Sequence, residues 1–371
     1  MATKAVSIDP TLVLEKKRDV GQISQWTLMR RRFMENKLSV AGGLILIVMY
    51  MMAAFAPFFA PYPFDALDSN NQFAAPTPIY MVNGQPSVCG TTQTLNKTTF
   101  TFEYAIDCNH AFPVQFFTSS YDYTLFGVIP SNIHLFGVDS SQKLYLFGAD
   151  GQGRDLLSRI LEGSRISLTV GLIGVVIAVV LGAVLGTASG YLGGVADNLI
   201  QRFIELLMSM PTLPLWAAFA AALPHDMSVV QRYFWITIVL SLIQWTSLAR
   251  QVRGKVLSYR TLDYTLAARL AGASDMRIIL THMVPNAISH IIVVAALAVP
   301  ASILGETALS FLGLGMLPPA VSWGVLLRDA QQIQVVEQHV WMLIPAVAVI
   351  VAVTCYQFLG DGLRDAADPY S

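Results

Sequence analysis

Six long stretches of apolar, almost uncharged residues constrain this chain more than any other feature. A helix needs roughly 20 apolar residues to cross a bilayer core about 30 Å thick. The stretches cover residues 38–59, 167–192, 199–223, 233–248, 287–312 and 341–359. We therefore predict an all-α polytopic membrane protein with six transmembrane helices.

Composition supports this class. Of the 371 residues, 54% are hydrophobic and 13% are charged, whereas an average soluble domain carries about 25% charged residues. The same figures exclude a disordered chain and a disulfide scaffold. The formal net charge is −1, so the composition gives no reason to expect a nucleic-acid partner.

The basic residues are distributed unevenly between the loops. Lys and Arg are frequent in segment 1–37 and in loop 250–286, but sparse in the long loop 60–166. Because cytoplasmic loops carry an excess of Lys and Arg, we predict a cytoplasmic N-terminal segment 1–37 and a cytoplasmic tail 360–371. Loop 60–166 is then outside, between the first helix (38–59) and a core of five helices (167–359).

The outer loop contains the features of a small folded unit. Cys89 and Cys108 both lie on the predicted oxidising side, where a disulfide can form. The run TTFTFEYAI between them alternates with period two, which is typical of a β-strand. We predict a Cys89–Cys108 disulfide and an inserted subdomain with short strands at about 73–136, with two free thiols as the alternative. Cys355, in the sixth stretch, is expected to be a small buried residue.

Small residues recur at every fourth position of the second stretch. One helix face without side chains lets a neighbouring helix approach closely, and such packing holds helices together in lipid. The alternative is that glycine is simply frequent in membrane helices. The predicted packing residues are Gly174, Ala178, Gly182, Gly186 and Gly190.

Two carboxylates lie inside the apolar stretches, where a lipid-facing charge is costly. Glu205 and Glu306 are therefore candidates for a translocation path, and an interfacial or structural role is the alternative. The six histidines are scattered without metal-ligand spacing, so no metal site is predicted. Without a GxxxxGK[ST], HExxH or GxSxG motif, we expect no catalytic residue and no nucleotide bound by this chain.

Loop 250–286 contains a short predicted helix at 261–270, followed by Ala271–Gly272 as a stop signal. A short, partly apolar helix outside the membrane has nothing of its own to pack against. It is expected to dock into the groove of a partner, with a position on the membrane surface as the alternative.

The sequence DYTLAARLAGASDMRIILTHMVPN in this loop resembles the EAA signature of permease subunits of binding-protein-dependent ABC importers. Ala267 and Ala268 match its two alanines, Gly272 its glycine and Pro285 its final proline. Leu266 stands where the family usually has Glu, and Val284 stands where it usually has Leu. The ATPase-coupling residues that this resemblance implies are Leu262, Asp263, Leu266, Ala267, Ala268, Gly272, Ala273 and Pro285.

Four other segments resemble the dipeptide/oligopeptide/nickel branch of these importers. They read RRFMENKLSVAGGLIL, FGADGQGRDLLSRILEGSRISLTVGL, GETALSFLGLG and GDGLRDAADP, in this order along the chain. The residues around 73–136 do not resemble the ordinary short loop of that branch. This insertion is either passive or contacts a binding protein or its substrate.

The resemblance implies the type I importer fold in a bacterial inner membrane. The implied partners are a second permease, two cytoplasmic ATPases that bind ATP and Mg²⁺, and an extracytoplasmic binding protein. The chain would translocate peptides by alternating access without being an enzyme itself; oligosaccharides or another small solute are alternatives, and nickel is disfavoured because no His/Cys/Met cluster is evident. Proteins of a different class that fit the composition are a secondary transporter and a membrane receptor scaffold.

Overall fold

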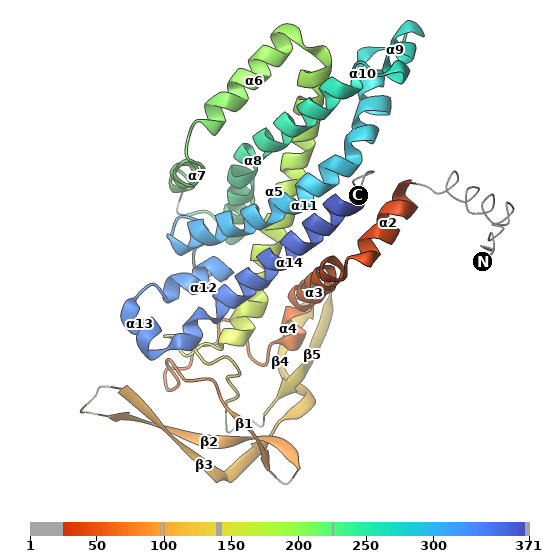
Figure 1. Cartoon of the computed structure of the whole chain (residues 1–371). Helices are drawn as coiled ribbons and strands as arrows, with labels where there is room; N and C mark the ends of the chain where they lie inside the picture. Colours follow the sequence, from red (N-terminus) through yellow and green to blue (C-terminus); the bar gives the residue numbers. More distant parts are fainter. Residues whose placement is uncertain are drawn as a thin grey trace, which may run out of the picture.

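The computed structural model describes residues 25–367, apart from 83, 97, 99–100, 139–142 and 225. A bundle of long helices forms most of it, and a β-rich insertion lies at the opposite end from the short helices α9 and α10 (Figure 1). Residues 1–24 of the predicted segment 1–37 and residues 368–371 of the predicted tail 360–371 lie outside the described part of the chain.

The first predicted span forms two helices, which follow α2 (Gln25–Glu35). Asn36 caps the first of them, α3 (Lys37–Ala54), by accepting a hydrogen bond from the Ser39 backbone at 3.3 Å. The second, α4 (Ala56–Phe59), begins next to Pro57, a residue that is well tolerated in a first helical turn.

The second predicted span belongs to a longer helix than expected. α5 (Leu156–Leu192) begins inside the segment predicted as extracytoplasmic loop 60–166, so residues 156–166 of that segment are helical. Apolar length marks only the membrane part of a helix, and here an N-cap extends it: the Asp155 carboxylate accepts a hydrogen bond from the Ser158 backbone at 2.8 Å.

The third predicted span is broken. α6 (Gly194–Met208) and α7 (Thr212–Ala221) meet at an angle of 85°. Pro211 lies at the break, where its missing N–H and fixed ring disfavour a continuous helix.

The remaining predicted spans are helical with different ends. α8 (Val229–Tyr259) extends beyond both limits of the fourth stretch, and α11 (Val284–Phe311) follows α9 (Asp263–Leu270), α10 (Asp275–Ile278) and the π-helix η1 (Ile279–Met283). α14 (Ile344–Ala367) follows α12 (Trp323–Asp329), α13 (Ile333–Gln338) and the 3₁₀-helix η2 (Val340–Leu343). Residues 360–367 therefore continue the last helix instead of forming the predicted tail.

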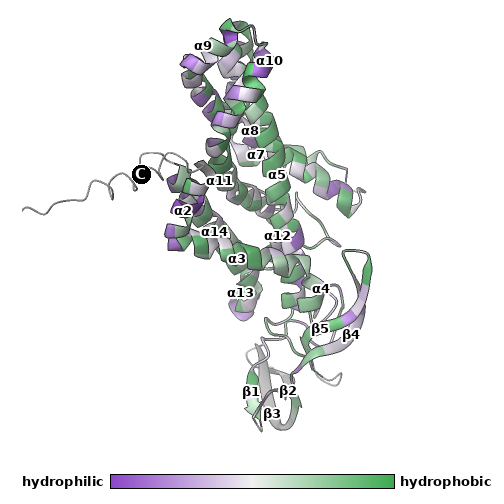
Figure 2. Cartoon of the chain, turned by 90° about the vertical axis from the view of Figure 1, so that its right-hand side faces the viewer, coloured by the Kyte–Doolittle hydropathy of each residue, from purple (hydrophilic) through white to green (hydrophobic). Residues whose placement is uncertain are grey.

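By length and composition, four helices of the described chain qualify as membrane spans, or up to five if the bent α6–α7 pair is one span. α8 is not among them, although it contains the fourth predicted stretch. Its C-terminal half carries Arg250, Arg253 and Lys255. The bundle is mostly hydrophobic, and hydrophilic residues gather near α9, α10 and α2 (Figure 2).

The insertion forms two antiparallel sheets. β1 (Ile79–Val82), β2 (Gln85–Asn96) and β3 (Thr101–Pro113) form one sheet, and β4 (Gln115–Leu125) pairs with β5 (Ile129–Gly137).

Cys89 on β2 is disulfide-bonded, and Cys355 is free and buried. Cys108 belongs to β3, the strand that pairs with β2. Its side chain lies outside the described part, so the Cys89–Cys108 pairing stays a prediction.

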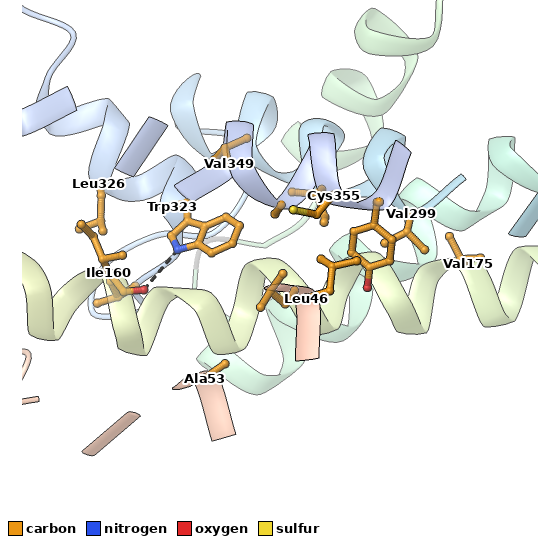
Figure 3. Packing of buried hydrophobic residues seen from close by; sticks show 14 of the residues in the cluster. Leu46, Ala53, Ile160, Val175, Val299, Trp323, Leu326, Val349 and Cys355 are labelled. Carbon is orange, nitrogen blue, oxygen red and sulfur yellow. Dashed lines mark hydrogen bonds between the residues drawn. The ribbon is translucent and has the colours of Figure 1, made fainter. Parts of the chain in front are cut away.

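The main core lies where α5 crosses α3, α11, α12 and α14 (Figure 3). Leu46, Val299 and Val349 come from three different helices and belong to one buried cluster with residues of α5. The fully buried Trp323 indole adds a directional contact, because its Nε1 donates to the Ile160 carbonyl at 3.2 Å. α5 is therefore the central helix of the bundle, and it runs between the end that carries α9 and α10 and the end that carries the β-rich insertion.

Candidate functional site

The predicted loop helix is present as α9 and ends where the sequence indicates. Gly272 has φ +78°, a conformation that suits glycine. The Gly272 N–H donates to the Arg269 carbonyl at 3.0 Å and the Ala273 N–H to the Ala268 carbonyl at 3.1 Å. These bonds satisfy carbonyls that a helix end otherwise leaves without partners.

An apolar stripe on α9 is open to solvent. Leu262, Leu266 and Leu270 are spaced four residues apart and are 43%, 44% and 90% exposed. This spacing places them on one side of the helix, and Ala267 beside them is exposed as well. We call Leu262, Leu266, Ala267 and Leu270 the α9 surface. Leu270 was not among the predicted coupling residues, although its four-residue spacing from Leu266 is a signal for it.

The other side of α9 faces the chain itself. Thr265 is fully buried and its Oγ1 donates to the Tyr259 carbonyl at 2.9 Å. Ala268, which was predicted for docking, is partly buried and packs against the cluster of Val252, Val256 and Ile278. Asp263 lies in the first turn of α9, and Pro285 lies in the first turn of α11.

A polar brace connects α9 to the end of α5. The Tyr191 hydroxyl donates to the Asp275 carboxylate at 3.0 Å and accepts from Arg269 Nη2 at 3.1 Å. The Arg269 guanidinium also lies 5.4 Å from the centroid of the Tyr191 ring. The brace joins residues on both sides of Gly272 to the C-terminal end of α5.

A second polar contact ties α6 to α8 nearby. Arg253 Nε and Nη2 donate to the two Asp197 carboxylate oxygens at 2.6 and 2.7 Å. This bidentate pair is the stronger type of hydrogen-bonded ion pair.

The small-residue stripe of α5 lies against α8. A Cβ on Gly182 would lie 2.9 Å from Leu248 Cβ, and one on Gly186 would lie 2.9 Å from Ala249 Cα. One on Gly190 would lie 2.9 Å from the Arg253 carbonyl oxygen, and Gly174 faces Ser241 at 3.4 Å. Ala178 is buried with Trp245 and Ala249. At Gly186 and Gly190 the backbone of α8 lies too close for a larger side chain, and at Gly182 the Leu248 side chain takes up the space.

We expect Gly186→Leu to reduce the stability of the folded chain by about 1–3 kcal/mol, the usual cost of overpacking a core. Thermal unfolding of the detergent-purified protein measures this. Val184→Phe is the matched control, because it adds the same number of carbon atoms on the exposed side of the same helix. Equal unfolding temperatures for the two variants would contradict the tight α5–α8 contact.

The two candidate carboxylates have different surroundings. Glu205 is exposed on α6 and pairs with Arg202 at 2.9 Å. Glu306 is fully buried on α11, where its two oxygens accept hydrogen bonds from Ser167 at 3.0 Å and Ser310 at 2.7 Å. Ser167 also accepts from the Trp323 backbone at 3.1 Å, so Glu306 joins α5, α11 and α12. A role of either residue in a translocation path stays a prediction.

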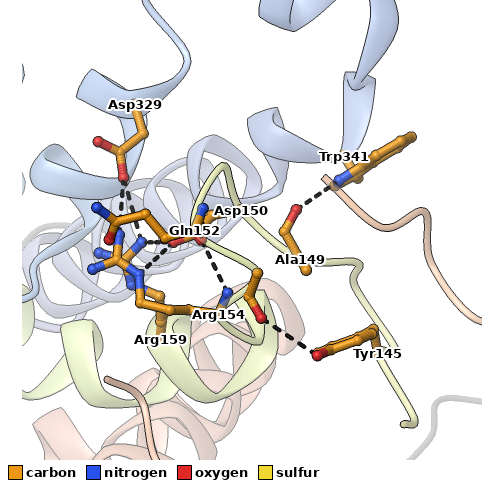
Figure 4. A network of polar contacts seen from close by, with 9 residues as sticks. Tyr145, Ala149, Asp150, Gln152, Arg154, Arg159, Asp329 and Trp341 are labelled. Carbon is orange, nitrogen blue, oxygen red and sulfur yellow. Dashed lines mark hydrogen bonds and ion pairs between the residues drawn. The ribbon is translucent and has the colours of Figure 1, made fainter. Parts of the chain in front are cut away.

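A buried charge cluster at the other end of α5 was missed as a site, although Asp150, Arg154 and Arg159 belong to the quoted FGADGQGRDLLSRILEGSRISLTVGL segment (Figure 4). Asp150 is 1% exposed and pairs with both Arg159 and Arg154, the latter at 2.8 Å. Asp329 at the end of α12 pairs with Arg159 at 3.3 Å and Arg154 at 3.8 Å. The cluster thus fixes α12 to the start of α5.

Within the described residues, no group of three or more His, Cys, Asp or Glu side chains is placed to hold a metal ion.

Comparison with known proteins identifies the family. Residues 178–369 match the family model described as "Binding-protein-dependent transport system inner membrane component". Residues 24–76 match the "N-terminal TM domain of oligopeptide transport permease C".

Curated relatives match over almost the whole chain. The oligopeptide transport system permease protein OppC of Escherichia coli K12 is 35% identical over 355 residues, covering 95% of this chain and 94% of that protein. OppC of Haemophilus influenzae is 34% identical, with 93% and 89% covered. The glutathione transport system permease protein GsiD of Pectobacterium atrosepticum is 30% identical, with 95% and 93% covered.

These matches, together with the apolar helices, define a multi-pass inner membrane permease. The chain belongs to the family of inner membrane components of binding-protein-dependent transport systems. It is the membrane component of an ABC importer, as the EAA-like segment implied.

Proposed function

We propose that this chain imports peptides across a bacterial inner membrane as one of two permease subunits of an ABC importer. The names of the relatives support peptides as the substrate class, because they include oligopeptide and glutathione permeases. Oligosaccharides remain the alternative substrate for the same machinery.

The observation that carries this proposal is the α9 surface. Its apolar side chains lie at the end of the bundle opposite the β-rich insertion (Figure 1). An amphipathic helix that exposes its apolar side in this way fits the groove of a partner protein. We assign a cytoplasmic ATPase as the partner of this surface and a second ATPase as the partner of the other permease. ATP and Mg²⁺ are bound by these ATPases, since this sequence has no GxxxxGK[ST] motif.

The proposed arrangement has six spans, with both termini and α9 in the cytoplasm. The α6–α7 pair is the third span, bent at Pro211, and α8 is the fourth. The excess of Lys and Arg in segment 1–37 and in loop 250–286 supports this orientation. A loaded binding protein docks on the outer side, and the lipid bilayer surrounds the two permeases.

The mechanism follows from how α9 is attached. Closure of the ATPases pushes α9, and the Tyr191–Asp275 and Tyr191–Arg269 contacts transmit the movement to α5. Because α5 packs along α8 through its glycines, the helices move together as a rigid body. This motion switches the cavity between the two permeases from outward to inward access.

Uptake into proteoliposomes tests the proposed function. The complex of both permeases and both ATPases is supplied with ATP inside and with binding protein and labelled peptides outside. We expect peptide accumulation that requires ATP and the binding protein. Accumulation of oligosaccharides instead would support the alternative substrate, and uptake driven by an ion gradient without ATP would indicate a secondary transporter. Binding without uptake would indicate a receptor scaffold.

We also propose that the insertion is a subdomain held by a Cys89–Cys108 disulfide. Closing a loop of this length restricts the unfolded chain by about 3 kcal/mol in the chain-entropy model. Mass spectrometry after alkylation without reduction is expected to find neither Cys89 nor Cys108 modified, while the free Cys355 becomes modified on denaturation. Alkylation of Cys89 and Cys108 without reductant would contradict the pairing.

A further inference from the structure

The turn of the β4–β5 hairpin carries large apolar side chains with little covering them. Phe126, Val128 and Ile129 are 61%, 79% and 56% exposed. Phe126 and Gly127 have positive φ angles of 53° and 72°, and the Val128 N–H donates to the Leu125 carbonyl at 3.1 Å. The turn is thus tightly closed and presents its side chains outward. We call Phe126–Gly127–Val128–Ile129 the hairpin tip.

Specific contacts hold this hairpin against the outer end of the first span. His134 on β5 is fully buried, with its Nδ1 2.8 Å from the Pro57 carbonyl and its Nε2 3.0 Å from the Tyr121 carbonyl. The ring of Phe126 meets the ring of Phe55 edge-on at 5.5 Å. These contacts fix the hairpin at its middle and at its tip. They therefore define the position of the tip along the axes of the neighbouring helices.

The residues that line the space beside the tip show where it lies relative to the apolar part of α5. A cavity of about 370 Å³ separates the tip from α3 and α5 and is lined by Tyr50, Phe126, Gly127, Leu168 and Thr169 among others. On α5, the last charged residue before the apolar stretch is Arg165, and no charge follows until Asp197. The tip is thus level with the first turn of the charge-free part of α5, where the hydrocarbon of the membrane begins.

The surface next to the tip is apolar too. α3 exposes Ile47, Val48 and Met51, and Figure 2 shows hydrophobic residues at the turn of the hairpin that lies beside the bundle. Arg165 also indicates that this level is the interface between membrane and water. Its guanidinium donates to the Ala53 and Ala54 carbonyls at 2.8 and 3.2 Å, at the C-terminal end of α3.

We propose that the hairpin tip inserts into the outer leaflet of the membrane and anchors the β-rich insertion to the lipid. An exposed apolar tip is costly in water, and at this depth acyl chains are the solvent that covers it. The proposal rests on the membrane placement of α3 and α5 proposed above. It assigns lipid, not a second protein, as the occupant of the tip.

Lipid-borne quenchers test this assignment. Val128→Cys is labelled with an environment-sensitive fluorophore in the full transporter, on a Cys355→Ala background, and reconstituted in liposomes. Gln115→Cys is the matched control, since Gln115 is exposed at the end of β4 that lies away from the hairpin tip. We expect nitroxide groups on the acyl chains to quench the probe at 128 several-fold more than the probe at 115. A water-soluble quencher is expected to give the reverse order.

Two outcomes would overturn the anchor. Equal quenching of both probes by the acyl-chain nitroxides would place the tip in water. Protection of the probe at 128 from both quenchers would place a protein over it, namely the second permease or the binding protein. ATP-dependent peptide uptake by the same liposomes is measured in parallel, so a failure of the proposed transport function is seen separately from a failure of the anchor.

Discussion

Asp150→Asn lowers the free energy of unfolding by about 3–5 kcal/mol, the usual cost of removing one partner from a buried ion pair. Asp150 is 1% exposed, and it pairs with Arg159, which is 2% exposed. Its carboxylate also accepts hydrogen bonds from the backbones of Gln152 and Arg154 at 2.8 and 3.0 Å. An amide can keep those backbone contacts, but it leaves the Arg159 charge buried without its closest counter-ion.

The same cluster offers a matched control. Asp329 contacts the same two arginines, but its side chain is 40% exposed. Asp329→Asn is therefore expected to cost about 1 kcal/mol or less, as partly exposed pairs do. Thermal unfolding of the purified complex in detergent compares the two variants. Similar losses for both would show that burial of Asp150 does not determine the strength of the cluster.

Leu266→Asp is expected to abolish ATP-driven uptake while the chain still reaches the membrane with its second permease. Leu266 contributes an exposed apolar side chain to the α9 surface and is not needed for the packing of Thr265 and Ala268 beneath it. A carboxylate buried in an apolar groove carries a desolvation penalty that the interface does not compensate. Uptake of labelled peptide and the ATPase activity stimulated by the binding protein are measured in the same liposomes.

Leu266→Met provides the control for this change. Methionine keeps an apolar side chain of similar volume and adapts to irregular surfaces, so most of the coupled uptake is expected to remain. Wild-type uptake by Leu266→Asp would exclude the α9 surface as the coupling contact. Loss of uptake in both variants would show that the shape of Leu266, not its polarity, matters.

The sequence predicted best those features that repeat with a helical period. The small residues of α5, at every fourth position, do meet α8 at distances where only small residues fit. The loop helix at 261–270 and its stop at Gly272 were also predicted, because helix formers followed by glycine are a local signal. Local sequence does not show which side of α9 the rest of the chain covers, and Ala268, which was predicted for docking, packs partly against the chain itself.

The features that were missed depend on contacts between distant segments. The start of α5 at Leu156 depends on the Asp155 cap and on the charge cluster, neither of which apolar length reveals. The importance of Asp150 becomes visible only when Asp329, far away in the sequence, lies beside the same arginines. The angle between α6 and α7 was likewise not predicted.

Photo-crosslinking from α9 tests the central claim most directly. A photoreactive group attached at Leu266→Cys in the assembled transporter, on the Cys355→Ala background, is activated in native membranes, and the crosslinked protein is identified by mass spectrometry. We predict a cytoplasmic ATPase as the main product, with a yield that changes when ATP is trapped in the complex. Crosslinks to lipid alone, or to the extracytoplasmic binding protein, would contradict it.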